Sequence, residues 1–153
     1  MPIHNVQCPD NDKVTPQQLL EFAGPLLWVE VSVPSAISQV LNSQKQIIPN
    51  PINGKALIDT GASKTCVDES ILKTLNLKPV GENEIATPQG TDKKFEYPVK
   101  LEFPGSPIPP LEFNSVIGVD LKAQDIAVLI GRDILCHCIL IMNGPAGNFT
   151  LSF

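Results

Sequence analysis

The feature that most constrains the fold is a strict alternation of apolar and polar residues between positions 95 and 103. The apolar set is Phe95, Tyr97, Val99, Leu101 and Phe103. Because successive side chains of a β-strand point to opposite faces, the alternation predicts a strand with one face in the core and one in water. Pro98 has no N–H to give to a neighbouring strand, which favours an edge position or a gap that faces solvent.

Other segments also predict short strands joined by turns. Leu27 to Val33 alternates in the same way, and a short apolar run ends at Ile58. The polar segment 87–92 has turn chemistry and joins Ile85-Ala86 to the alternating strand as a hairpin. Fifteen prolines are about twice the usual share. We therefore predict an all-β fold with one or two short helices, one of them at 68–75, where acidic residues precede apolar ones at helical spacing.

The chain divides into a short polar extension and one domain. Residues 1–24 are polar and show no sustained periodicity, so we predict an N-terminal extension there. Residues 25–153 suit a single compact domain, given 153 residues in all and 42% hydrophobic content.

Charge and cysteine content limit the partners and the compartment. The net charge of −5 and the absence of a Lys/Arg cluster argue against nucleic acid and anionic membranes. We see no secretory signal and no apolar run near the roughly 20 residues that span a bilayer, and we expect four free thiols in a cytoplasmic protein. Peptides or proteins are the expected partners.

The triplet Asp59-Thr60-Gly61 is the candidate for chemistry, because a buried strand delivers its carboxylate to a turn. On its own the triplet is only a favourable turn sequence. Its flanks change that interpretation: Ala56 to Ser63 resembles the active-site segment of retroviral and retroviral-like aspartic proteases. Val128 to Asp133 resembles the second signature of the same family, and the hairpin between them lies where the family has its flap. The resemblance covers about residues 26–153.

This resemblance implies a retropepsin-like closed barrel that works as a homodimer. Peptide hydrolysis without a metal takes one carboxylate as base and one carboxylic acid as proton donor. The chain has a single Asp-Thr-Gly triplet, so the resemblance implies that Asp59 of two subunits forms the dyad. Residues 148–153 resemble the strand that viral enzymes use between subunits.

The resemblance also implies roles for the neighbours of Asp59. Thr60 would hydrogen-bond across the dimer axis, and Gly61 would let the backbones approach closely. Around the aspartate, Gly131, Arg132 and Asp133 would be structural. Arg132 needs an acceptor of its own, because many viral members have an acidic residue where this chain has Ser63. The substrate contacts implied are Ala62, Ser63, Gln89, Gly90 and Thr91.

We therefore expect an aspartic endopeptidase that cleaves extended polypeptides with water and no cofactor. A non-catalytic dimerisation or peptide-binding module on the same fold is the alternative. A third reading is a thiol or metal protein centred on Cys136-His137-Cys138. A structural zinc site needs four donors, and only His4, Cys8 and Cys66 remain to supply them, so we expect no metal.

Overall fold

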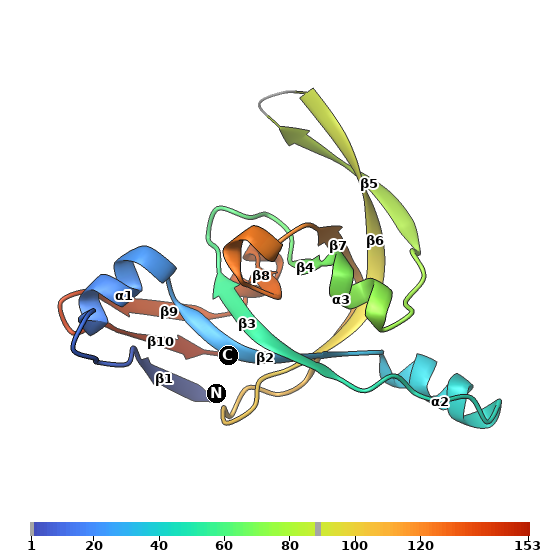
Figure 1. The fold of residues 1–153 in the computed structure, drawn as a ribbon, viewed down its shortest axis with the longest axis horizontal. Coiled ribbons are helices and arrows are strands. Elements are labelled where there is room, and N and C mark those ends of the chain that lie inside the picture. The colour runs from blue at the N-terminus through green and yellow to red at the C-terminus, as the bar shows by residue number, and fades with distance from the viewer. Residues whose placement is uncertain (1, 88–89) are drawn as a thin grey trace.

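The computed structural model describes residues 2–87 and 90–153 and is mostly β with a few short helices (Figure 1). The elements in chain order are β1 (Ile3–Gln7), α1 (Pro16–Ala23), β2 (Leu26–Ser32), α2 (Ser35–Ser43), β3 (Ile52–Ile58), β4 (Cys66–Asp68), α3 (Glu69–Thr74), β5 (Gly81–Thr87), β6 (Gly90–Glu102), β7 (Leu111–Val119), η1 (Lys122–Gln124), β8 (Val128–Ile130), α4 (Arg132–Leu135), β9 (Ile139–Asn143) and β10 (Asn148–Ser152). None of the described helices is long and apolar enough to cross a membrane.

The larger of two sheets has the strand order β2-β3-β8-β4-β7-β6-β5. β2 also pairs with β6, through Glu30–Ser32 and Lys100–Glu102. This additional pairing joins the first strand in the order of the sheet to the sixth. Most of the core lies inside this arrangement, where the inward residues of β2 and β6 are almost fully buried. The alternation predicted for both strands is confirmed from Leu27 to Val31 and from Tyr97 to Phe103, whereas Ser32, which we expected on the outer face of β2, is buried.

The structure corrects one expectation for β6 and decides between two alternatives for Pro98. Phe95 is 46% exposed, because it lies where β6 pairs with β5 in the hairpin that projects from the sheet (Figure 1). β6 is not an edge strand, since it pairs on both sides, so a gap in the pairing is the alternative that remains for Pro98. Pro98 is accommodated by a register irregularity between Tyr97 and Val99 in the β6–β7 pairing. On the other side of β6, the pairing with β5 reaches Glu96 and the pairing with β2 begins at Lys100.

The smaller sheet has the order β1-β10-β9 and is antiparallel throughout. Residues 1–24, which we predicted as a polar extension, contribute β1 and α1. A capping box between Thr15 and Gln18 starts α1, with Pro16 in its first turn. The strand predicted at 148–153 is present as β10, and its residues Phe149 and Leu151 are buried in the hydrophobic core.

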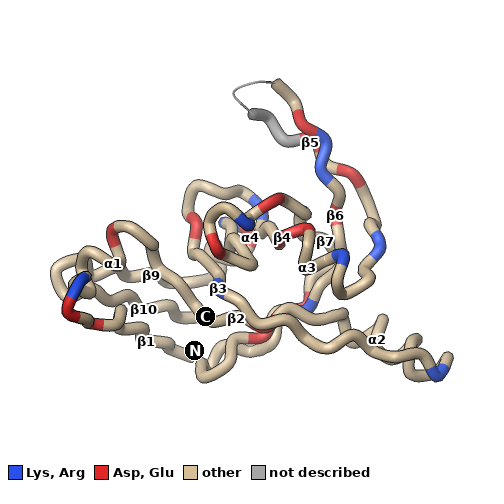
Figure 2. Tube along the Cα trace, in the orientation of Figure 1, with Lys and Arg blue, Asp and Glu red and all other residues tan. Residues whose placement is uncertain are grey.

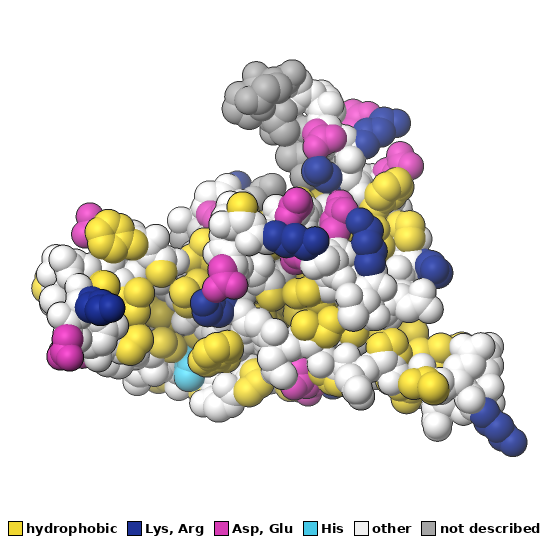
Figure 3. All heavy atoms as spheres, viewed as in Figure 1, with side chains coloured by type: hydrophobic (Ala, Val, Ile, Leu, Met, Phe, Trp, Pro, Cys, Tyr) yellow, Lys and Arg dark blue, Asp and Glu magenta, His cyan; other side chains and the backbone are white. Residues whose placement is uncertain are grey.

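Charged residues of both signs are dispersed over the molecule. Along the backbone they recur on the β5–β6 hairpin, on the loops and near α3 (Figure 2). On the face shown in Figure 3, basic and acidic side chains are interspersed, and apolar side chains show between them. The hairpin carries ion pairs of its own, Lys94 with Asp92 at 2.8 Å and Lys93 with Glu82 at 3.9 Å.

Candidate active site

Asp59 follows β3 directly, and its side chain accepts hydrogen bonds from the backbone of the turn that it begins. Its backbone N–H donates to the carbonyl oxygen of Ile130 at 3.0 Å, which continues the parallel pairing of β3 with β8. Its Oδ1 accepts the N–H groups of Gly61 at 2.8 Å and Ala62 at 3.2 Å. Backbone N–H donors stabilise a charged carboxylate and fix its orientation. Within residues 2–87 and 90–153, Oδ2 has no hydrogen-bond donor, and the side chain is partly exposed.

Arg132 holds the other side of this turn. Its Nη1 donates to the carbonyl oxygens of Thr60 and Gly61, each at 2.8 Å, and its backbone N–H donates to the carbonyl of Ala62 at 2.9 Å. The sequence did not identify the hydrogen-bond acceptors of Arg132, because Ser63 cannot serve as an anionic partner. These backbone carbonyl oxygens are the acceptors. Arg132 thus acts on the backbone of the triplet and leaves the Asp59 carboxylate free of an ion pair.

Gly131 permits the close packing that brings α4 to this turn. A Cβ at Gly131 would lie 2.5 Å from the carbonyl carbon of Lys64 and 2.8 Å from the nitrogen of Thr65. Such contacts exclude any side chain, because backbone atoms cannot move aside cheaply. A Cβ at Gly61 would lie 3.0 Å from Oδ1 of Asp59, the oxygen that is already hydrogen-bonded.

Thr65 is a site residue that the sequence reasoning missed. It is fully buried, and its hydroxyl donates to Oδ1 of Asp133 and accepts the N–H of Gly131. The partners lie 66 and 68 positions away along the chain, so no local pattern could have found the pairing. Asp133 was predicted as structural near the site, and it is connected to the turn through Thr65.

Cys66 lies directly beyond Thr65 in β4. Burial, together with the smaller effect of the nearby carboxylates of Asp133 and Asp59, raises the pKa of its thiol to about 11. A thiol in this state is protonated at neutral pH and is a poor nucleophile or metal ligand. Cys66 is therefore a packing residue behind the aspartate.

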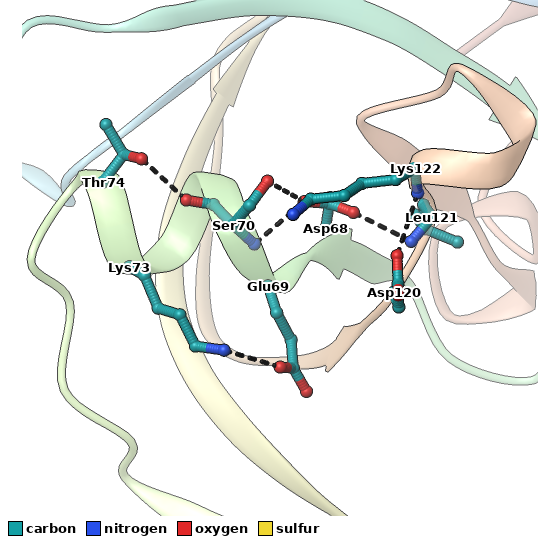
Figure 4. A network of polar contacts seen from close by, with 8 residues as sticks. All are labelled: Asp68, Glu69, Ser70, Lys73, Thr74, Asp120, Leu121 and Lys122. Carbon is teal, nitrogen blue, oxygen red and sulfur yellow. Dashed lines mark hydrogen bonds and ion pairs between the residues drawn. The ribbon is translucent and has the colours of Figure 1, made fainter.

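A second polar network fixes β4 and α3 at the far end of the same strand (Figure 4). Asp68 is buried and accepts the N–H groups of Ser70 at 2.9 Å and Leu121 at 2.8 Å, together with the Ser70 hydroxyl. Burial pushes the pKa of Asp68 upward, but the hydrogen bonds outweigh burial and hold it below its usual value. The network caps the helix predicted at 68–75 and ties it to η1.

The residues predicted for substrate contact fall in two places. Ala62 and Ser63 lie in the turn beside Asp59, whereas Gly90 and Thr91 lie at the far end of the β5–β6 hairpin (Figure 1). Gln89 is outside the described residues. Gly90 has φ +132°, a conformation that favours glycine. The hairpin and its turn were predicted from the sequence, and in Figure 1 it extends to the same side as the β3–β4 loop.

The Cys136-His137-Cys138 segment closes α4 as a helical turn. The three backbone N–H groups donate to carbonyls one turn earlier, and the Cys138 thiol contacts the carbonyl of Ile134 at 3.4 Å. In the described part of the chain, no three or more His, Cys, Asp or Glu side chains are grouped for a metal ion.

No protein-family model and no curated protein sequence matches this chain. The solved structures that it resembles include a viral protease, a retropepsin-like aspartic protease and a retroviral protease-like domain. One is the foamy viral protease-reverse transcriptase in complex with an RNA/DNA hybrid, at 24% identity and TM-score 0.44; the match covers 74% of this chain and 12% of that one. Another is a retropepsin-like aspartic protease from Rickettsia conorii, at 16% identity and TM-score 0.45, covering 97% and 90%. A third is the retroviral protease-like domain of Ddi1 from Leishmania major, at 15% identity and TM-score 0.40, covering 78% and 82%.

Proposed function

We propose that this chain is an aspartic endopeptidase in which Asp59 of two identical subunits activates water against a peptide bond. The observation that carries the proposal is the geometry of Asp59. One carboxylate oxygen is oriented by two N–H groups, and the turn is clamped by Arg132. The other oxygen is left for a water molecule or a second carboxyl group.

The chemistry requires two carboxyl groups, because one group cannot be base and acid in the same step. Two carboxyls held together share a proton over a range of pH, which supplies both forms at once. One described chain brings a single aspartate to this turn, so we propose a homodimer of retropepsin-like closed barrels. The exposed Thr60 side chain has no hydrogen-bond partner within the described chain, which leaves its hydroxyl available to the second subunit.

Substrate would bind as an extended strand between the Asp59 turn and the β5–β6 hairpin. Backbone hydrogen bonds then give affinity and side-chain pockets give specificity. In this proposal the hairpin is the flap, with Gln89, Gly90 and Thr91 over the peptide and Ala62 and Ser63 below it. No cofactor takes part. We place the catalytic domain at residues 25–153, with the first 24 residues added to it, and infer a reducing, cytoplasmic compartment from the four unpaired cysteines.

A peptide-library cleavage assay of the wild type and Asp59→Asn tests the proposal. The amide is nearly isosteric with the carboxylate but cannot act as a base, so cleavage should fall to background while the fold and the dimer remain. Cleavage by Asp59→Asn at the wild-type rate would refute the proposal. Peptide binding without cleavage by the wild type would favour the non-catalytic alternative.

A further inference from the structure

The three-stranded sheet leaves only its outer strands available to a second molecule. All five residues of β10 pair with β1 on one side, from Ile3↔Ser152 to Gln7↔Asn148, and with β9 on the other. We expected residues 148–153 to pair between subunits. They do form a paired strand, but both partners come from the same chain, so β10 has no free edge.

β9 is an exposed and apolar edge strand. Its sequence, Ile139 to Asn143, contains no charge, and Ile139, Ile141 and Met142 are 54%, 57% and 52% exposed. Edge strands that must stay unpaired usually carry Lys, Pro or a bulge to prevent association. β9 has none of these, and its pairing with β10 is regular along its whole length.

β1, the opposite edge, is chemically different. Its first residue, Ile3, is apolar and 59% exposed, but its other two exposed side chains are polar and bond back into the sheet: Asn5 accepts from the Thr150 hydroxyl at 2.7 Å, and the Gln7 amide donates to the carbonyl of Ala146 at 3.1 Å. Satisfied polar groups gain little from exchanging one partner for another. Exposed apolar side chains are therefore concentrated on β9, which carries three of them, whereas β1 carries only Ile3 at its start.

β9 is also coupled to the catalytic turn. Arg132, at the start of α4, holds the carbonyls of the Asp59 turn, and Asp133 holds Thr65. The turn that closes α4 ends at Cys138, and β9 begins at Ile139. A molecule that binds to β9 therefore binds to a strand that begins seven residues after Arg132, and Arg132 is hydrogen-bonded to the backbone around Asp59.

We propose that β9 is the surface on which a second copy of this chain docks, by antiparallel pairing of the two β9 strands into one continuous six-stranded sheet. This inference rests on the proposed function, because the Asp59 site is incomplete without a second copy. A symmetric interface brings the same patch together from both sides, and an uncharged strand pairs with its own copy without repulsion. Exposed Ile139 and Ile141 would then be covered by their counterparts.

Sedimentation velocity over a range of concentrations tests this interface with matched variants. Ile141→Lys places two like charges at the paired edge, and it should raise the dimer dissociation constant by about a hundredfold or more. Ile141→Val and Ile47→Lys, the latter at a 92% exposed position in the α2–β3 connection, should associate like the wild type. Unchanged association of folded Ile141→Lys, or a wild type that is monomeric while it cleaves peptides, would overturn the proposal.

Hydrogen exchange on the wild type gives an independent answer that does not depend on a variant folding. Amide protection of residues 139–143 should rise with protein concentration, while that of residues 3–7 should not, because only the β9 edge gains hydrogen bonds on dimerisation. Equal behaviour of the two edges would contradict the proposal.

The two proposals fail in distinguishable ways. If the wild type cleaves peptides, Asp59→Asn does not, and Ile141→Lys still dimerises, only the β9 interface is wrong. If Ile141→Lys abolishes dimerisation but the wild type cleaves nothing, the interface stands and the peptidase function is wrong.

Discussion

Asp133 binds Thr65 with both of its carboxylate oxygens. Oδ2 accepts the Thr65 N–H at 2.9 Å, and Oδ1 accepts the Thr65 hydroxyl at 2.8 Å. Thr65 is fully buried and begins the segment that leads from the Asp59 turn into β4. The pair therefore anchors one end of the Asp59 turn to α4, while Arg132 anchors the other.

Asp133→Ala should destabilise the protein, because it leaves a buried N–H and a buried hydroxyl without an acceptor. Loss of charge-assisted hydrogen bonds of this kind costs about 2–3 kcal/mol. Thr65→Ser, which keeps the hydroxyl, is the control and should cost much less. Urea unfolding midpoints measure both, and equal midpoints for Asp133→Ala and the wild type would show that the pair contributes nothing.

Arg132→Ala should lower kcat more than it lowers stability. The substitution removes the donor shared by the carbonyls of Thr60 and Gly61, so the turn that presents Asp59 is no longer fixed. A misplacement of about 1 Å can cost about a hundredfold in rate. Lys73→Ala, which removes an exposed cation paired with Glu69 (Figure 4), should leave kcat unchanged. Steady-state kinetics on one peptide separate the two, and a purely KM effect for Arg132→Ala would count against this role.

Gly131→Ala should be strongly destabilising, by about 3 kcal/mol, since the new methyl group would overlap backbone atoms of Lys64 and Thr65. Gly144→Ala is the matched control, because a Cβ there has no described atom within 4 Å. Thermal unfolding of the two variants should differ by several degrees or more. Similar melting temperatures would mean that the close approach of α4 to this segment is not needed.

Asp68→Asn should destabilise the protein at neutral pH by about 1–2 kcal/mol, through loss of the charged cap of α3. Because hydrogen bonds hold the folded-state pKa of Asp68 below its unfolded value near 3.8, its stabilisation is present above that value. It is lost as pH falls through the folded-state pKa. The difference between variant and wild type should therefore stay constant from pH 7 down to the unfolded-state value near 3.8 and shrink below it. Asp120→Asn, in the same network (Figure 4), is the exposed control, and a difference that grows in acid would reverse the assignment.

Local patterns predicted the parts of this fold whose signal is local. The alternation from Tyr97 to Phe103 identified β6, because burial of one face imposes a two-residue period. The apolar run before Asp59 identified β3. The hairpin followed from its turn chemistry. In the site, the triplet and Gly131 were singled out by motif, and Gly131 packs against the backbone of Lys64 and Thr65.

The rest depends on contacts between distant positions. β1 is only five residues long, and its pairing partner, β10, lies more than a hundred residues away, so no local pattern predicted it. α2 has no buried residue, and its sequence is as compatible with a loop as with a helix. The exposure of Phe95 follows from how far the hairpin projects, which the period of the strand does not encode.

The central claim is that catalysis needs one Asp59 from each of two subunits, and a mixing experiment tests it most directly. Wild type is equilibrated with increasing amounts of Asp59→Asn at constant total concentration above the dimer dissociation constant, and the initial rate of peptide cleavage is measured. In an equal mixture about a quarter of the dimers carry two aspartates, so the rate should fall with the square of the wild-type fraction. A rate that falls linearly with that fraction would show that each subunit works alone and would contradict the shared dyad.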